Sequence, residues 1–162
     1  MKRIIPSIVA ATALYFAAGG IADLPAQSSN PAPQVPVNIV ADVYANYFVM
    51  QKALAEDSLA SVPVPALARA SQVNQDRTAL FRPELAAQAE ALATATDLPT
   101  ARQIFKAVSG YMIQAWRSGR TTAGAIHELH SPMDNVDWLQ EGLVVQNPYQ
   151  GKACLDCGTI VK

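Results

Sequence analysis

With 162 residues, 51% of them hydrophobic, the chain is long enough for one domain with a hydrophobic core. Its 12 basic and 13 acidic residues leave no cationic excess, which argues against a nucleic-acid-binding protein. No Ser-His-Asp set, paired catalytic carboxylates or glycine-rich phosphate loop supports hydrolysis or nucleotide chemistry, so we expect no enzymatic activity.

The first 22 residues have the layout of a secretory signal peptide. Lys2 and Arg3 are basic, and the apolar stretch from Ile4 to Ala22 ends in small residues. We expect cleavage after residue 22, or as late as residue 26, and a periplasmic or secreted protein. The alternative is an uncleaved anchor, because about 20 apolar residues can span a bilayer. The protein would then contact the membrane only through this segment.

Residues 27–36 form a proline-rich spacer, and residues 38–162 are expected to form a single helical domain. Apolar residues at helical spacing predict helices at 38–56, 65–80, 84–95 and 98–117, with Asp97 as an N-cap. In the second helix, Leu67, Ala70, Val73 and Leu80 should face inward. The predicted fold class is mainly α: a four-helix up-and-down bundle with a short irregular or β C-terminal tail packed on it.

The tail itself carries few helical signals. Residues 125–129 and 142–146 could form short extended segments, and Asn147 to Gly151 has the composition of a turn. We expect Trp138 and Tyr149 to be the apolar side chains that anchor the tail on the helices.

The C-terminal motif, residues 130–158, is similar to that of a known family. The matching positions are Pro132-Met133, Trp138-Leu139, Asn147-Pro148-Tyr149, Gly151, Leu155 and Cys157-Gly158, with looser matches at 53–57, Arg102, Phe105 and Ser109. The chain thereby resembles the bacterial domain of unknown function 3347 family over about residues 38–162. That domain occurs alone behind a signal peptide or on periplasmic adaptor subunits of heavy-metal efflux pumps.

The chain departs from that family at two sulfur positions. Ser131 stands where the family usually has a cysteine before Pro-Met, and Cys154 stands where it has a methionine. The resemblance implies metal tolerance or handover of metal to a periplasmic efflux-pump component. The altered sulfur positions change the ligand set that such a site would use.

Soft donors in the motif predict a metal site formed by Met133, Cys154 and Cys157, with His130 as an outer candidate. Cu(I) is the expected metal, and Zn is possible if His127 or His130 completes the ligand set. The alternative is a structural or protein-interaction domain whose tail is locked by a Cys154–Cys157 disulfide, as is usual for exported cysteines. A thioredoxin-like thiol oxidoreductase is less consistent with this α-rich chain, and Gly158 after Cys157 excludes the c-type haem motif.

Overall fold

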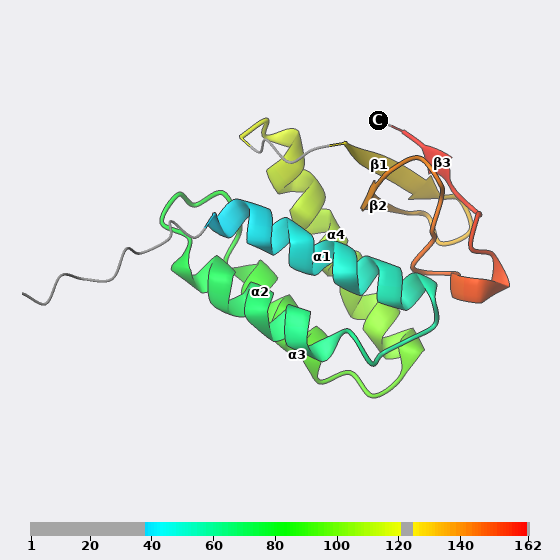
Figure 1. The fold of residues 1–162 in the computed structure, drawn as a ribbon, viewed down its shortest axis with the longest axis horizontal. Helices are drawn as coiled ribbons and strands as arrows, with labels where there is room; N and C mark the ends of the chain where they lie inside the picture. The colour runs from blue at the N-terminus through cyan, green and yellow to red at the C-terminus, as the bar shows by residue number, and fades with distance from the viewer. Residues whose placement is uncertain (1–37, 121–124, 162) are drawn as a thin grey trace, which may run out of the picture. The chain divides into compact units, whose positions relative to one another are not determined.

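A computed structural model of the chain describes residues 38–120 and 125–161, which fall in one compact unit, Pro36–Lys162 (Figure 1). The predicted signal peptide and the proline-rich spacer lie outside these described residues. Among the described residues, no helix is both long enough and apolar enough to cross a bilayer.

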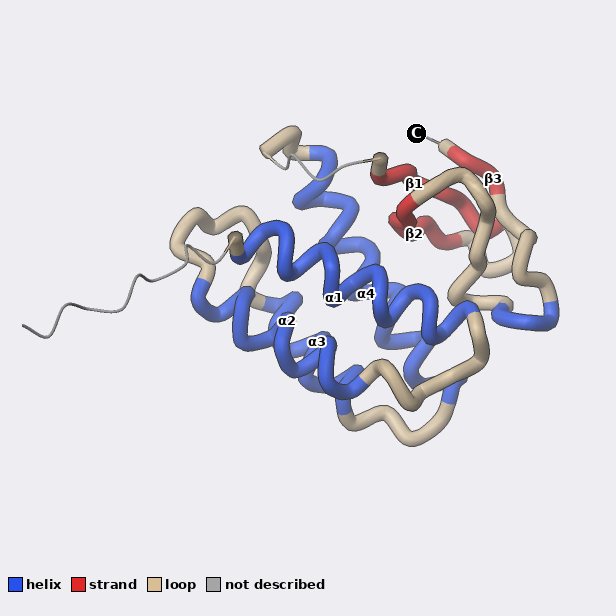
Figure 2. The backbone as a smooth tube through the Cα atoms, in the orientation of Figure 1, coloured by secondary structure: helices blue, strands red, loops and turns tan. Residues whose placement is uncertain are grey.

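The described part of the chain is mainly α, and all four predicted helices are confirmed. They are α1 (Ile39–Ala55), α2 (Pro63–Gln75), α3 (Glu84–Ala93) and α4 (Leu98–Arg117), followed by a small sheet (Figure 2). Asp97 caps α4 as predicted, since its carboxylate accepts a 2.8 Å hydrogen bond from the Thr100 amide. Each helix contacts the next along the chain. The up-and-down arrangement of all four helices stays a prediction.

Helix α2 ends five residues earlier than predicted, at Gln75 instead of residue 80. The cause is Asp76, whose carboxylate accepts hydrogen bonds from the backbone amides of Thr78, Leu80 and Phe81. An aspartate that binds nearby amides offers the backbone an alternative to continuing the helix. Leu80 is therefore buried, as predicted, but it lies in the loop after α2 and not in the helix.

The predicted inward face of α2 is wrong at one position. Leu67 is 54% exposed, whereas Ala66 and Arg69 are fully buried. The Arg69 guanidinium carbon lies 5.1 Å from the centre of the Tyr47 ring, a cation–π distance. Burial lowers the pKa of Arg69 to about 9, which still leaves it charged at neutral pH. A pattern of apolar residues cannot predict a buried charge of this kind.

Replacing Arg69 with methionine should raise the free energy of unfolding by about 1 to 3 kcal/mol. All three guanidinium nitrogens are buried and have no hydrogen-bond partner among the described residues, and burial of unpaired polar atoms is unfavourable. Urea denaturation at pH 7 measures the change, with Arg77→Met, in an exposed loop, as the control. If Arg69→Met but not Arg77→Met lowered the free energy of unfolding, the contacts of the Arg69 guanidinium would stabilise the fold by more than its burial destabilises it.

Three short strands form an antiparallel sheet of order β2-β1-β3. The strands are β1 (Ile126–Ser131), β2 (Val136–Glu141) and β3 (Thr159–Ile160). The extended segment predicted at 125–129 corresponds to β1. Strand β2 lies against α4 and α1, and it buries Trp138 and Leu139. Tyr149 is also buried, so both predicted anchors of the tail are confirmed.

The segment predicted to be extended at 142–146 is not a strand. Leu143 and Val144 are 65% and 81% exposed, so these two apolar side chains do not enter the core, and only Val145 of this run packs against it. The buried Gln140 side chain holds the segment as a loop: its amide nitrogen donates to the carbonyls of Gly142 and Val144, and its oxygen accepts from the Gln146 amide. Gly142 adopts a φ of 78°, which favours glycine and ends β2.

Candidate functional site

Asn147 is the centre of the hydrogen bonds that fix the tail. Its buried side-chain nitrogen donates to the Ser131 hydroxyl at 3.1 Å and to the Cys157 carbonyl at 2.5 Å. Its side-chain oxygen accepts from the amides of Tyr149 and Gln150 at 2.8 and 3.2 Å. One side chain thus joins the end of β1, the turn at 147–150 and the segment that carries the cysteines.

A second contact fastens the same turn to the helices. Arg102 of α4 donates to the Pro148 carbonyl at 2.8 Å, to the Leu54 carbonyl at 2.9 Å and to the Asp57 carboxylate at 2.5 Å. The hydrogen bond from Arg102 holds the pKa of Asp57 below its usual value. Gly151 lies against this pair with a φ of 55°, and a Cβ at this position would clash with both Asp57 and Arg102. Glycine is therefore required at position 151 by conformation and by space.

Ser109 connects the tail to the core of the helices. Its hydroxyl lies 2.9 Å from the Tyr47 hydroxyl and accepts a hydrogen bond from the Tyr149 hydroxyl at 3.1 Å. Burial raises the pKa of Tyr47 to about 12 and also raises that of Tyr149, so both phenols stay neutral at physiological pH. Ser109, Asn147 and Tyr149 thus have an architectural role in this chain.

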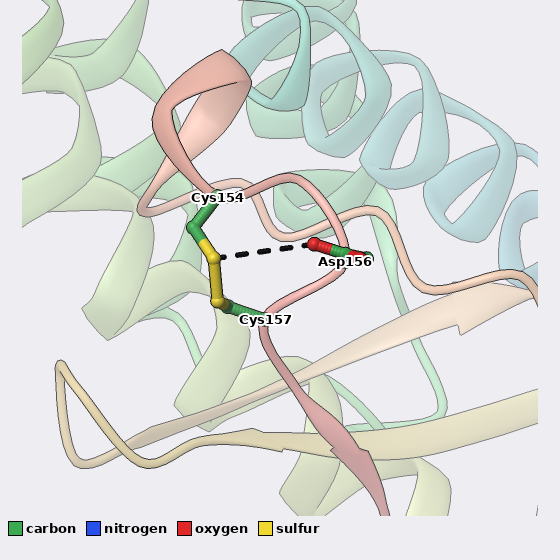
Figure 3. Close-up of side chains that lie close together, drawn as sticks. All are labelled: Cys154, Asp156 and Cys157. Atoms are coloured by element: carbon green, nitrogen blue, oxygen red, sulfur yellow. Dashed lines mark hydrogen bonds between the residues drawn. A yellow bond between two sulfur atoms is a disulfide. The ribbon is translucent and has the colours of Figure 1, made fainter.

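The two cysteines lie in the segment that follows the short η1 turn (Gly151–Ala153), which Cys154 caps at its C-terminal end. Cys154 and Cys157 form a disulfide, and the Asp156 carboxylate lies 4.0 Å from the Cys154 sulfur (Figure 3). The two sulfurs and a carboxylate oxygen all lie within 4.8 Å of one another, close enough to hold one metal ion. Both cysteines are half-buried.

Asp156 was not among the residues predicted from the sequence, although it lies between the two cysteines. Acidic residues are common on exposed turns, so its presence alone is a weak signal. The fold shows that Asp156 belongs to the group, because the turn brings its carboxylate to the same side as the two sulfurs (Figure 3).

Met133 lies in the turn between β1 and β2, where it is 65% exposed. His130 of β1 pairs with Thr159 of β3, so the end of β1 and the start of β3 lie at the same end of the sheet. Met133 follows the one strand, and Cys157 precedes the other. The fold therefore places the predicted methionine and cysteine ligands at one end of the sheet.

His130 has a different environment from the cysteines. Its Nδ1 lies 2.7 Å from the Asp137 carboxylate of β2, and the imidazole is 34% exposed. His130 does not belong to the group formed by Cys154, Asp156 and Cys157. His127, the other histidine considered for zinc, also lies outside that group.

Comparison with known proteins adds no assignment. The chain matches no family model, and it has no significant similarity to a curated protein or to a solved structure. The function must therefore be argued from the residues and their geometry.

Proposed function

We propose that this protein is an exported soft-metal-binding module whose ligands are the thiolates of Cys154 and Cys157, formed when a thiol reductant outside this chain supplies two electrons and breaks the disulfide. The observation that carries the proposal is the group of Cys154, Asp156 and Cys157, whose ligand atoms lie within 4.8 Å of one another. The Cys157 carbonyl is held by Asn147, and β3 begins two residues later, at Thr159. A preorganised backbone of this kind lowers the entropic cost of closing a ligand pair on a metal ion.

The main alternative is a disulfide with a purely structural role, and the chain geometry limits what that disulfide can contribute. The bond joins residues only three positions apart. In the chain-entropy model such a small loop contributes about 2 kcal/mol, less than a disulfide that closes a long loop. The tail is also held by Asn147, by Arg102 and by the pairing of β3 with β1. The fold should therefore survive reduction, with the two thiols kept in place.

The donor set favours Cu(I), with Zn as the competing ion. Two thiolates suit a low-coordinate soft ion, and the thioether of Met133 at the same end of the sheet would be a suitable third ligand. The Asp156 carboxylate is a hard donor, which zinc accepts and Cu(I) does not need. The resemblance described above adds a role in metal tolerance, with handover to a periplasmic efflux-pump component. The signal-peptide pattern and the paired cysteines support the export that we propose.

The metal can be distinguished by two substitutions in the reduced protein. Asp156→Asn should weaken Zn binding about tenfold or more and leave Cu(I) affinity almost unchanged, because only zinc uses the carboxylate. Met133→Leu should weaken Cu(I) binding and leave Zn affinity almost unchanged, because the thioether is a soft donor. Competition with a chromophoric chelator for each metal measures these affinities, and Glu90→Gln, at an exposed position of α3, is the control for a lost carboxylate.

If Asp156→Asn weakened Zn binding while Met133→Leu left the Cu(I) affinity unchanged, the site would be assigned to zinc. X-ray absorption of the Cu(I)-loaded protein gives a direct check on the ligands: we expect sulfur scattering alone around the metal. Oxygen or nitrogen in the Cu(I) coordination shell would contradict the ligand set proposed here.

A further inference from the structure

A second candidate site lies between α4 and the β1–β2 hairpin, apart from the cysteine group. It is a cavity of about 390 Å³. One wall is a single face of α4, on which Lys106, Gly110, Ile113 and Arg117 follow one another at helical spacing. The opposite wall comes from the hairpin, which packs against α4 through β2. The two elements that form the walls, α4 and the β1–β2 hairpin, are labelled in Figure 1. A cavity of this volume is large enough for a small organic molecule.

The α4 wall supplies positive charge. Lys106 forms no hydrogen bond or ion pair with the described residues, and its ammonium lies 5.8 Å from the centre of the Tyr149 ring. Arg117 uses its Nε and Nη2 to bind the buried Glu128 carboxylate, which fixes the guanidinium in orientation. Its Nη1 takes no part in that pair and keeps its donors. Two cations therefore line the cavity, and one of them has no anionic partner there.

The hairpin wall supplies an oriented imidazole. The Nδ1 of His130 lies 2.7 Å from Asp137, and both residues line the cavity. The second ring nitrogen, Nε2, is left for a ligand, because hydrogen bonding at one nitrogen fixes the role of the other. Asp137 is the one carboxylate among the lining residues, and it is already engaged by His130. The charges thus favour an anion over a cation.

We infer that this cavity binds a small organic carboxylate, with the carboxylate group near Lys106 and His130. Ile113 and Val136 add apolar surface to the lining, which suits a short hydrocarbon chain better than a bare phosphate. Gly110 leaves open space in the α4 wall of the cavity, since nothing lies within 4 Å of the position that a Cβ would occupy. The proposal does not depend on the cysteine site, and it applies equally to the oxidised protein.

The test is NMR of the two histidine rings of the oxidised protein during titration with butyrate, succinate, inorganic phosphate and butylamine at constant pH and ionic strength. Butyrate or succinate should shift the ring signals of His130 in a saturable manner and leave those of His127, which does not line the cavity, in place. Butylamine matches butyrate in chain length but carries the opposite charge, so it should have no effect.

Two variants localise the binding. Gly110→Leu fills the cavity and should weaken carboxylate binding at least tenfold, and Lys106→Met should weaken it to a similar extent. Lys52→Met on α1, which removes an exposed lysine elsewhere, is the control and should bind as the wild type does. The inference is overturned if carboxylates leave His130 unshifted, if butylamine shifts it equally, if only phosphate binds, or if a folded Gly110→Leu protein binds butyrate normally.

Discussion

Replacing Asn147 with alanine should lower the free energy of unfolding by about 3 kcal/mol or more, the largest stability effect that we expect from a polar residue in this chain. The substitution removes four hydrogen bonds, to the Ser131 hydroxyl, the Cys157 carbonyl and the amides of Tyr149 and Gln150. Each buried polar group that is left without a hydrogen-bond partner lowers the free energy of unfolding by about 1 to 3 kcal/mol. Thermal and urea denaturation of the oxidised protein measure the change.

Asn38→Ala is the matched control, because it removes an asparagine that caps α1 through a single exposed hydrogen bond. That change should lower the free energy of unfolding by about 1 kcal/mol. Asn147→Asp is a second comparison, since it keeps the acceptor, loses both donors and buries a charge, so it should also destabilise the protein. If Asn147→Ala were no worse than Asn38→Ala, Asn147 would not be the residue that fixes the tail.

The single variants Cys154→Ser and Cys157→Ser should each bind Cu(I) more than about 100-fold more weakly than the reduced wild-type protein does. Changes to residues that only support a metal ligand typically cost 10- to 100-fold, so loss of a ligand itself should cost more. The thiolate is the group that binds the metal, and the serine hydroxyl is a poor donor for a soft ion. Competition titration with a Cu(I) chelator gives both affinities.

The same variants test whether the tail needs its disulfide. Each serine variant should lose about 2 kcal/mol of stability at most and keep the circular dichroism spectrum of the wild type. The hydrogen bonds of Asn147 and the pairing of β3 with β1 hold the backbone without the covalent bond. If instead the tail unfolded in both variants, the disulfide would have the structural role of the alternative hypothesis.

The helices could be predicted from the sequence because their signals are local. Apolar spacing located all four, and Asp97 marked the start of α4. The predicted elements differ from the structure where hydrogen bonds from a polar side chain to the backbone decide the local conformation. Asp76 ends α2 by binding amides beyond it, and Gln140 holds 142–146 as a loop although that segment is apolar. Such hydrogen bonds depend on the folded backbone and leave no periodic pattern in the sequence.

The candidate site was predictable in part. The spacing of Cys154 and Cys157 allowed either a metal pair or a disulfide, and it is the disulfide that the structure contains. The contribution of Asp156 depends on how the turn folds, so spacing could not reveal it. The pairing of His130 with Asp137 depends on the register of β1 with β2. Long-range pairings of this kind require the fold.

The central claim is that an external two-electron reductant breaks the S–S bond of the Cys154–Cys157 disulfide, and that the two thiols formed lose their protons to bind Cu(I) on an otherwise unchanged tail. The most direct measurement is a titration of the reduced and the oxidised protein, separately, into a chromophoric Cu(I)–chelator complex without oxygen. The account predicts that the reduced protein removes one Cu(I) per chain and that the oxidised protein removes none, because a disulfide offers no thiolate. Failure of the reduced, folded protein to take Cu(I) from the chelator would contradict the proposed function.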